Sequence, residues 1–150
     1  MTLYLNIGSN IGDRRSNLLR AVALLEQLAW IIPGTLRLSD LIQSQPWGFE
    51  SQNTFLNIGV AVDIKPDTPP LKILDDTLAV QNEIDPSSHR DTDNNYIDRV
   101  IDIDIIAIDS LVFNHPRLII PHPRMHLRPF VMEPMRQLAP DWQHPVHGKL

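Results

Sequence analysis

Asp98-Arg99-Val100-Ile101-Asp102-Ile103-Asp104-Ile105-Ile106 decides the fold, because this stretch is rich in β-branched residues and places two aspartates two positions apart. Such a run favours a β-strand. Residues two apart on a strand project from the same face, so we expect the carboxylates of Asp102 and Asp104 side by side, with their Cα atoms about 6–7 Å apart. The isoleucines at the alternate positions are expected to face a core; they are Ile101, Ile103 and Ile105.

The paired carboxylates have two interpretations. Adjacent carboxylates repel each other unless a positive group lies between them, and hard oxygen ligands suit Mg²⁺. The alternative is an amphipathic strand with a solvated acidic face, and the stretch alone does not decide between the two. Arg99 can meet a phosphate oxygen. Because Arg99 and Asp102 have opposite parity, Arg99 must lie before the strand or on a bulge to share a site with Asp102.

Bulk properties narrow the class of protein. The 150 residues suit a single domain over residues 1–150. The net charge of −5 argues against nonspecific nucleic-acid binding, and the absence of cysteine excludes disulfides and a thiol nucleophile. The apolar start is too short for a signal peptide, and no stretch approaches the roughly 20 apolar residues of a membrane span. We therefore expect a cytoplasmic protein without nucleic-acid or membrane partners; its oligomeric state is open, with a monomer as the simplest expectation.

The remaining pattern predicts the order of the elements. The predicted strands cover residues 2–7, 34–42, 55–63 and the acidic stretch to about 108, and the predicted helices cover 16–28 and about 66–84. This β-α-β-β-α-β order is that of the split βαβ, ferredoxin-like fold, an α+β antiparallel sheet with helices on one face. Short strands near 112–113 and 118–120 and a helix over 130–138 are expected to add a C-terminal layer.

Two loops contain residue types that suit a ligand. Gly8-Ser9-Asn10-Ile11-Gly12 lacks both the Gly-x-Gly-x-x-Gly and the Gly-Lys-Ser/Thr pattern, so a tight turn is favoured over a phosphate cradle. Pro46-Trp47-Gly48, with Phe55 and Asn57, suits stacking on a flat heterocycle and hydrogen bonding to its edge. The alternative is that both aromatic residues are core anchors. The polar stretch 85–95 is expected to be the most mobile part of the chain.

A basic corner lies further along the chain. His122 stands between two prolines in Pro121-His122-Pro123, with Arg117 before it and Arg128 after it. Cations spread around a corner suit a polyphosphate, although each residue alone is more often a surface residue. His122 and His126 have no carboxylate companion, so zinc is not favoured.

Several motifs follow one another along almost the whole chain. They are Leu5-Asn6-Ile7-Gly8-Ser9-Asn10-Ile11-Gly12-Asp13, Asn17-Leu18, Pro46-Trp47-Gly48, Phe55-Leu56-Asn57, Arg99-x-x-Asp102-Ile103-Asp104-Ile105-Ile106, Pro116-Arg117-Leu118, Pro121-His122-Pro123, Arg128-x-Phe130-Val131-x-x-Pro134 and Leu138-Ala139-Pro140. Each is weak alone, but their order and spacing together are specific. The chain resembles the 6-hydroxymethyl-7,8-dihydropterin pyrophosphokinases of folate biosynthesis.

The resemblance implies a ferredoxin-like fold and transfer of pyrophosphate from ATP to the pterin hydroxymethyl group, with release of AMP. It also implies two Mg²⁺ ions, with Asp102 and Asp104 as ligands. The implied catalytic residues are Arg90, Arg99, Asp102 and Asp104. The implied ATP contacts are Glu83, Arg99, Ile105, Arg117, His122 and Arg128. The implied pterin contacts are Ser44, Gln45, Trp47, Phe55, Asn57 and Phe130, with the two phenylalanines on the ring faces and Asn57 at the ring edge.

The chain departs from the family pattern on the nucleotide side. Ile97-Asp98 stands where the family usually has Gly-Pro, and Ile119 stands where it usually has threonine. Residues 85–90 supply only Arg90 where the family supplies several arginines, and the acidic position at the helix end is assigned to Glu83. The metal and pterin positions are unchanged. Slow turnover or an altered nucleotide preference is therefore expected rather than loss of pterin binding.

Two other functions stay open on the sequence. One is a catalytically weak or inactive relative that binds pterin or nucleotide. The other is a metal-dependent nuclease that uses the same carboxylates, against which the net negative charge and the lack of a basic stripe argue. Phosphoryl transfer needs positioning and charge neutralisation rather than a covalent protein group, so no general base is assigned.

Overall fold

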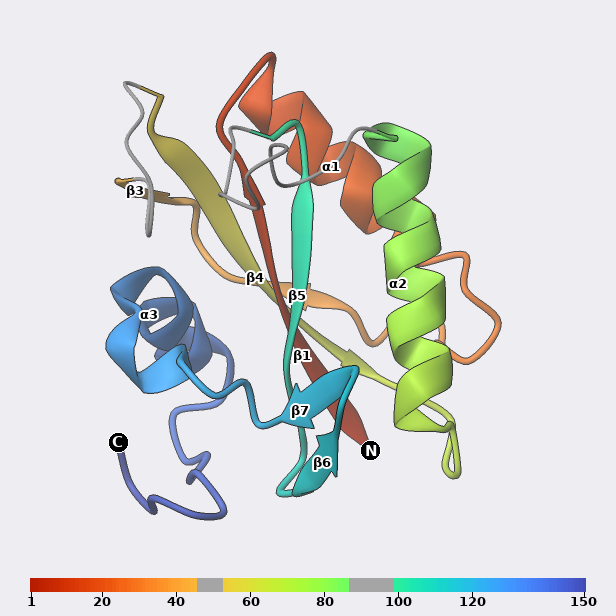
Figure 1. Ribbon diagram of the computed structural model, residues 1–150, viewed down its shortest axis with the longest axis vertical. Coiled ribbons are helices and arrows are strands. Elements are labelled where there is room, and N and C mark those ends of the chain that lie inside the picture. Colours follow the sequence, from red (N-terminus) through yellow and green to blue (C-terminus); the bar gives the residue numbers. More distant parts are fainter. Residues whose placement is uncertain (46–52, 87–98) are drawn as a thin grey trace.

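The computed structural model describes residues 1–45, 53–86 and 99–150, which form an α+β fold with an antiparallel sheet (Figure 1). The elements in chain order are β1 (Thr2–Ser9), α1 (Arg14–Leu25), β2 (Arg37–Leu38), β3 (Ile42–Ser44), β4 (Phe55–Asp63), α2 (Pro70–Ile84), β5 (Asp102–Ile108), β6 (Phe113–His115), β7 (Leu118–Ile120), the 3₁₀ helix η1 (Met125–Leu127) and α3 (Pro129–Leu138). None of the helices in these ranges has the length and apolar character needed to cross a lipid bilayer.

The main sheet has the strand order β2-β4-β1-β5, with β3 also paired to β4. All of these pairs are antiparallel. β1 therefore lies inside the sheet, and β5 lies at its edge within the described part of the chain. β6 and β7 form a separate antiparallel pair. The α+β class expected from the sequence is confirmed, as are the strand over 55–63 and the C-terminal helix.

Two elements differ from the sequence-based expectation. The segment 34–42 was expected to form one strand, but the chain leaves the sheet between β2 and β3. There the backbone N–H of Asp40 donates to Oε1 of Gln137 in α3 at 2.8 Å, so a tertiary hydrogen bond replaces a ladder bond. The first helix spans 14–25 rather than 16–28, because the backbone after its last turn tightens into i→i−3 hydrogen bonds.

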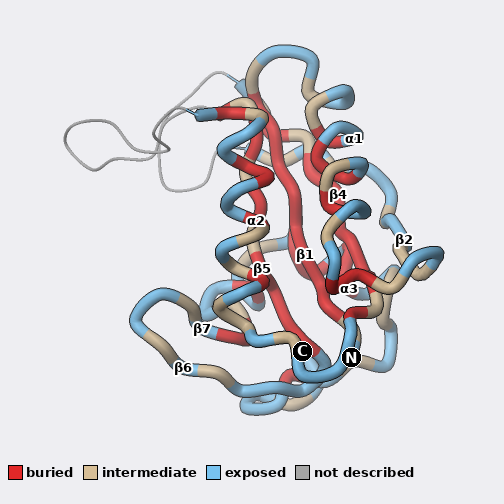
Figure 2. Tube along the Cα trace, turned by 90° about the vertical axis from the view of Figure 1, so that its right-hand side faces the viewer, coloured by how far each residue is buried: buried red, intermediate tan, exposed pale blue. Residues whose placement is uncertain are grey.

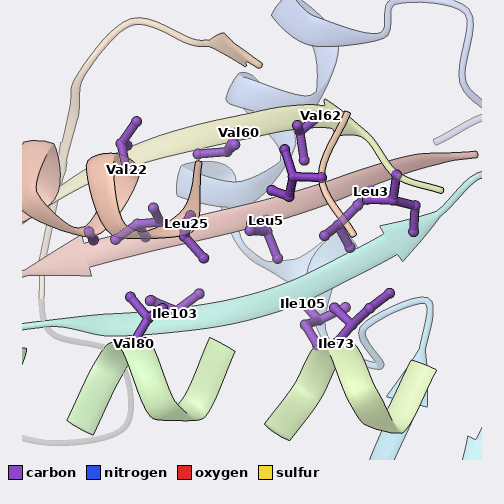
Figure 3. Close-up of a cluster of buried hydrophobic side chains, with 14 of the residues drawn as sticks. Leu3, Leu5, Val22, Leu25, Val60, Val62, Ile73, Val80, Ile103 and Ile105 are labelled. Atoms are coloured by element: carbon purple, nitrogen blue, oxygen red, sulfur yellow. The ribbon is translucent and has the colours of Figure 1, made fainter. Parts of the chain in front are cut away.

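One face of the sheet carries the main core, which α1 and α2 cover (Figure 3). Val80 and Ile73 of α2 face Ile103 and Ile105 of β5, and aliphatic side chains of β1, β4 and α1 fill the rest. Ile101 belongs to the same cluster. The predicted alternation of β5, with its isoleucines in the core, is therefore confirmed.

The opposite face is covered at one end by η1 and α3. Figure 2 shows the buried strands between α2 on one side and α3 on the other. A register shift between Tyr4 and Leu5 leaves Ile106 as an extra residue in β5, so that Ile106 and Ala107 both pack in the second cluster beside α3. The other end of this face holds a pocket.

Candidate active site

This pocket has a cavity volume of about 110 Å³. Its walls come from β1, β3, β4, the start of β5, the corner after β7 and the first turn of α3. The lining residues are Asn6, Gly8, Ser44, Gln45, Phe55, Asn57, Arg99, Asp102, Asp104, His122, Arg128 and Phe130. All except Asn6 and Gly8 are among the site residues expected from the sequence, so the fold brings together residues that are far apart in the chain.

The two aspartates of β5 share one wall of the pocket. Asp102 pairs with Gly8 and Asp104 pairs with Asn6 across the β1–β5 ladder. Arg99 lies before β5, as its parity required, and its Nη1 is 3.1 Å from Oδ1 of Asp102. Nη1 of Arg128 is 3.8 Å from Oδ2 of Asp104. Each carboxylate thus lies beside one guanidinium group inside a pocket, which does not fit a plain solvated acidic face.

The electrostatics of Asp104 favour a positively charged ligand. Burial raises the pKa of Asp104 above its ordinary value, and the guanidinium groups of Arg128 and Arg99 oppose that rise without cancelling it. The ionised carboxylate is therefore less stable here than in water. A cation bound against its oxygens would favour the ionised form.

Two phenylalanines line the same pocket, each with an arginine beside its ring. Cζ of Arg99 lies 5.8 Å from the ring centroid of Phe55, and Cζ of Arg128 lies 5.7 Å from that of Phe130. Both distances are within the range of cation–π attraction. The backbone carbonyl of Phe130 accepts a hydrogen bond from Nδ2 of Asn6 at 2.8 Å, which ties the start of α3 to β1.

Asn57 supplies a fixed amide at the pocket wall. It is buried, and its Nδ2 donates to the carbonyl of Ile42 at 3.1 Å and to Oγ of Ser44 at 2.7 Å. Its Oδ1 faces Gly8, where an added Cβ would lie only 2.9 Å from that oxygen. The missing side chain at Gly8 therefore leaves room for the amide and for a ligand that bonds to it.

His122 is neutral at physiological pH. Burial lowers the pKa of His122 to about 4, helped by the positive charges of Arg128 and Arg124 and opposed by Asp102. The backbone N–H of Arg124 donates to its Nδ1 at 3.2 Å, so the proton of the neutral ring is on Nε2. The backbone N–H of His122 donates to the carbonyl of Ile106 at 2.8 Å, which anchors the proline corner to β5. The side chain therefore offers a neutral donor.

A second pocket, with a cavity volume of about 360 Å³, adjoins the first. Both pockets have Asp102, Asp104 and His122 in their walls. The other lining residues are Leu74, Leu78, Gln81, Ile103, Ile105, Pro116, Arg117, Leu118, Ile119 and Pro123. The acidic pair thus stands between a pocket with two phenylalanines and a pocket with mostly aliphatic walls.

The structure places the remaining predicted residues as follows. Arg117 and Ile105 line the second pocket, and Nη2 of Arg117 is 2.6 Å from Oδ1 of Asp75 on α2. Glu83 is exposed on α2 and lines neither pocket. Trp47 and Arg90 lie outside the described residues.

Sequence reasoning missed two amide residues. Asn6 lines the first pocket, and its place two positions before Gly8 on β1 is the signal that could have found it. Gln81 is buried on α2, lines the second pocket, and accepts the backbone N–H of Ile103 through Oε1 at 2.8 Å. Gln81, rather than Glu83, is therefore the residue of this helix turn that reaches β5.

Comparison with known proteins decides the family. The model of the 7,8-dihydro-6-hydroxymethylpterin-pyrophosphokinase family matches residues 4–140. The chain belongs to this family. The resemblance found in the sequence motifs is therefore confirmed, and the chain is an enzyme, a pyrophosphokinase of folate biosynthesis.

Three relatives illustrate the similarity. The 2-amino-4-hydroxy-6-hydroxymethyldihydropteridine pyrophosphokinase of Porphyromonas gingivalis is 40% identical over 144 residues, covering 95% of this chain and 93% of the relative. The protein of the same name from Bacillus subtilis is 36% identical over 136 residues, covering 91% and 77%. The "Folic acid synthesis protein FOL1" of Dictyostelium discoideum is 34% identical over 146 residues, covering 96% of this chain but 20% of the relative.

Proposed function

We propose that this pyrophosphokinase transfers pyrophosphate from ATP to 6-hydroxymethyl-7,8-dihydropterin, in a reaction that depends on Mg²⁺ and yields AMP and the pterin diphosphate. The observation that carries the proposal is the position of Asp102 and Asp104. They lie in the shared wall of two adjoining pockets, each beside an arginine. Such a wall suits a polyphosphate that lies between a nucleotide on one side and an acceptor alcohol on the other.

The smaller pocket suits the pterin. Phe55 and Phe130 offer aromatic faces to a flat ring. Asn57, held by two hydrogen bonds of its own, presents an amide to the edge of such a ring, with Ser44 and Gln45 in the same wall. We therefore assign the heterocycle to this pocket, with its hydroxymethyl group directed toward the two aspartates.

The larger pocket suits ATP. Ile105, Leu118 and Leu78 provide apolar walls for the adenine base, and Arg117 provides a cation at the rim. Neutral His122 stands beside the acidic pair, where its Nε2–H can donate to a phosphate oxygen. Glu83 is left out of this assignment, because it lines neither pocket.

The donor set fits magnesium. Mg²⁺ keeps several waters and is commonly bound through one or two carboxylates together with substrate phosphates. Among the described residues no group of three His, Cys, Asp or Glu side chains converges on one point, so Asp102 and Asp104 would hold the ions together with phosphate oxygens. Two bound ions would neutralise phosphate charge and lower the pKa of a coordinated alcohol.

The chain's own residues then supply orientation and charge. Arg99 and Arg128 present guanidinium groups to the space beside the carboxylates, where negative charge gathers during transfer. Phe55, Phe130 and Asn57 hold the acceptor in place, and much of the rate gain is expected from this positioning. No described residue is assigned as a general base.

The order of the strands supports a ferredoxin-like topology. With β2 and β3 counted as one broken strand, the order β2-β4-β1-β5 and the two helices α1 and α2 on one face match the split βαβ arrangement. We therefore assign the ferredoxin-like topology, with the β6–β7 pair and α3 as additions.

A product assay tests the function. Purified protein is incubated with ATP, Mg²⁺ and 6-hydroxymethyl-7,8-dihydropterin, and nucleotides are separated by chromatography. AMP in equal amount to pterin diphosphate is the expected result. ADP as the product, or uptake of pterin in calorimetry with no AMP formed over hours, would contradict the proposal. A parallel plasmid-nicking assay should show no cleavage.

A further inference from the structure

Three buried polar side chains hold the backbone that leads into β5. Oδ1 of Asn10 accepts the N–H of Arg99 at 2.8 Å, and Oδ2 of Asp85 accepts the N–H of Val100 at 3.2 Å. Oε1 of Gln81 accepts the N–H of Ile103 at 2.8 Å. The exposed fractions of the three accepting residues are only 3%, 5% and 6%. We call this set of acceptors, Asn10, Gln81 and Asp85, the entry clamp.

The entry clamp acts where the sheet gives little support. The β1–β5 ladder begins at Asp102, so Arg99 and Val100 precede it. Ile103 belongs to the edge strand, and its N–H bonds to α2 instead of to a strand. Asn10 also donates its own backbone N–H to the carbonyl of Arg99 at 3.2 Å, so both the N–H and the carbonyl of Arg99 are hydrogen-bonded to Asn10.

The clamped segment carries the charges of the site. Arg99 is the first clamped residue, and its guanidinium pairs with Asp102 at 3.1 Å. Asp102 and Asp104 flank Ile103, the last clamped residue. A shift of this backbone would therefore move one arginine and both carboxylates together. Displacements of about 1 Å at such groups are enough to slow phosphoryl transfer strongly.

We infer that Asn10, Gln81 and Asp85 are positioning residues, which fix Arg99, Asp102 and Asp104 through their backbone amides. A charged side chain is not needed for this role, because each of the three contributes an acceptor oxygen. An unsatisfied N–H in a buried segment is costly, so losing one acceptor favours movement of the segment rather than a vacant bond. The kinetic part of this inference rests on the proposed function, whereas the structural part does not.

Matched substitutions separate the acceptor from the shape of the side chain. Asn10→Asp, Gln81→Glu and Asp85→Asn keep an acceptor oxygen at the same position. Asn10→Leu, Gln81→Met and Asp85→Leu remove it with little change in size. Thr77→Val is the control, because Thr77 is buried on α2 and, within the described part of the chain, its hydroxyl bonds only to the carbonyl of Leu74 in its own helix.

Amide hydrogen exchange tests the structural part without any substrate. Each acceptor-deleting variant is expected to accelerate exchange about tenfold or more at its own partner amide, that of Arg99, Val100 or Ile103. The acceptor-keeping variants and Thr77→Val are expected to leave those three amides unchanged. Equal exchange in the deleting and keeping variants would overturn the inference. Where Asn10→Leu does not fold, Asn10→Ser, which shortens the acceptor, replaces it at the Arg99 amide.

Kinetics and metal binding test the positioning part. Asn10→Leu and Gln81→Met are expected to lower kcat about tenfold or more while the pterin KM changes less than about threefold, with rescue by Asn10→Asp and Gln81→Glu. A fall in kcat no larger than that of Thr77→Val would overturn the inference.

If the unmodified chain makes no AMP, the proposed function fails, and Mn²⁺ titration then tests whether the three residues position the carboxylates. Weaker Mn²⁺ binding in the deleting variants alone supports the clamp, and unchanged binding overturns it.

Discussion

The two faces of the central sheet are built by the same strands, but one face forms the core and the other forms the pocket. On the face under α1 and α2, aliphatic side chains of β1, β4 and β5 pack in one core. On the other face, α3 covers one end and the pocket occupies the rest, where carboxylates, guanidinium groups and amides meet. Along β5, side chains that face the core alternate with side chains that line the pocket: Ile103 packs in the core, and its neighbours Asp102 and Asp104 line the pocket.

The contrast shows how a small fold can hold an unfavourable site. Asp104 is buried enough to raise its pKa, a cost that the aliphatic face offsets. Stability and catalysis should therefore respond to different positions on the same strand, and mutations can separate the two.

The largest effect is expected from the carboxylates. Asp102→Asn or Asp104→Asn removes a negative charge that would hold the metal ions beside the phosphates, so AMP formation should fall about 10³-fold or more. Because the pKa of Asp104 is raised in the folded protein, its ionised form lowers stability at neutral pH, and Asp104→Asn should keep or increase the melting temperature. Thermal melting and the AMP assay measure both quantities. Asp67→Asn, at an exposed turn, is the control and should change neither.

Truncation of a core side chain on the aliphatic face should lower stability and leave the kcat nearly unchanged. Ile73→Ala leaves a cavity between α2 and β5 and should lower the free energy of unfolding by about 2–5 kcal/mol. The kcat of the folded protein should stay within a few-fold. Denaturant titration gives the free energy, and Val112→Ala, at an exposed valine, should shift it by less than about 0.5 kcal/mol. A loss of kcat without a loss of stability would mean that the two faces are not separable at this position.

Two glycines sharpen the comparison within the mixed face. An added Cβ at Gly59 would lie 2.5 Å from Cβ of Pro134 in α3, so Gly59→Ala should cost about 1–3 kcal/mol of stability. At Gly8 the added atom would lie 2.9 Å from Oδ1 of Asn57, in the pocket. Gly8→Ala should therefore raise the pterin KM, and its loss of stability should be smaller than that of Gly59→Ala. Similar effects of both changes on both quantities would argue against a division of this face into a packed end and a binding end.

The smallest effect is the loss of stability expected from His122 as the pH falls. Its pKa is about 4 in the folded protein against an ordinary 6.5, so the unfolded chain takes up a proton first as the pH falls. Stability should therefore decline between about pH 6.5 and 4, by less than about 2 kcal/mol because the side chain is partly exposed, and should be unaffected above pH 7. Melting temperatures of the unmodified chain and of His122→Asn across this range test it. Parallel pH curves for the two proteins would contradict the assignment.

Local pattern was sufficient for the elements whose side chains alternate cleanly. The period of two in β5 correctly placed its isoleucines in the core, and parity alone required Arg99 to precede the strand. The break between β2 and β3 was not predicted from the local pattern; at this break Asp40 donates a hydrogen bond to Gln137, almost a hundred residues away.

The same reason explains what was missed at the site. The sequence favoured Glu83 because it is acidic, but the phase of α2 turns Gln81 toward β5 and leaves Glu83 exposed. Asp85 begins the stretch 85–95, for which mobility was predicted; residues 87–95 lie outside the described residues, and Asp85 itself is buried against Val100. Such polar contacts between distant segments have no local periodicity, so pattern analysis does not detect them.

The position of β5 at the sheet edge has a consequence for solubility. An isoleucine-rich edge strand is a template for intermolecular pairing and fibril growth. Here two of its outward hydrogen-bonding groups are occupied from within the molecule: Oε1 of Gln81 accepts the N–H of Ile103, and the N–H of His122 donates to the carbonyl of Ile106. Changes that loosen α2 or the proline corner should therefore promote self-association of this enzyme during expression and storage.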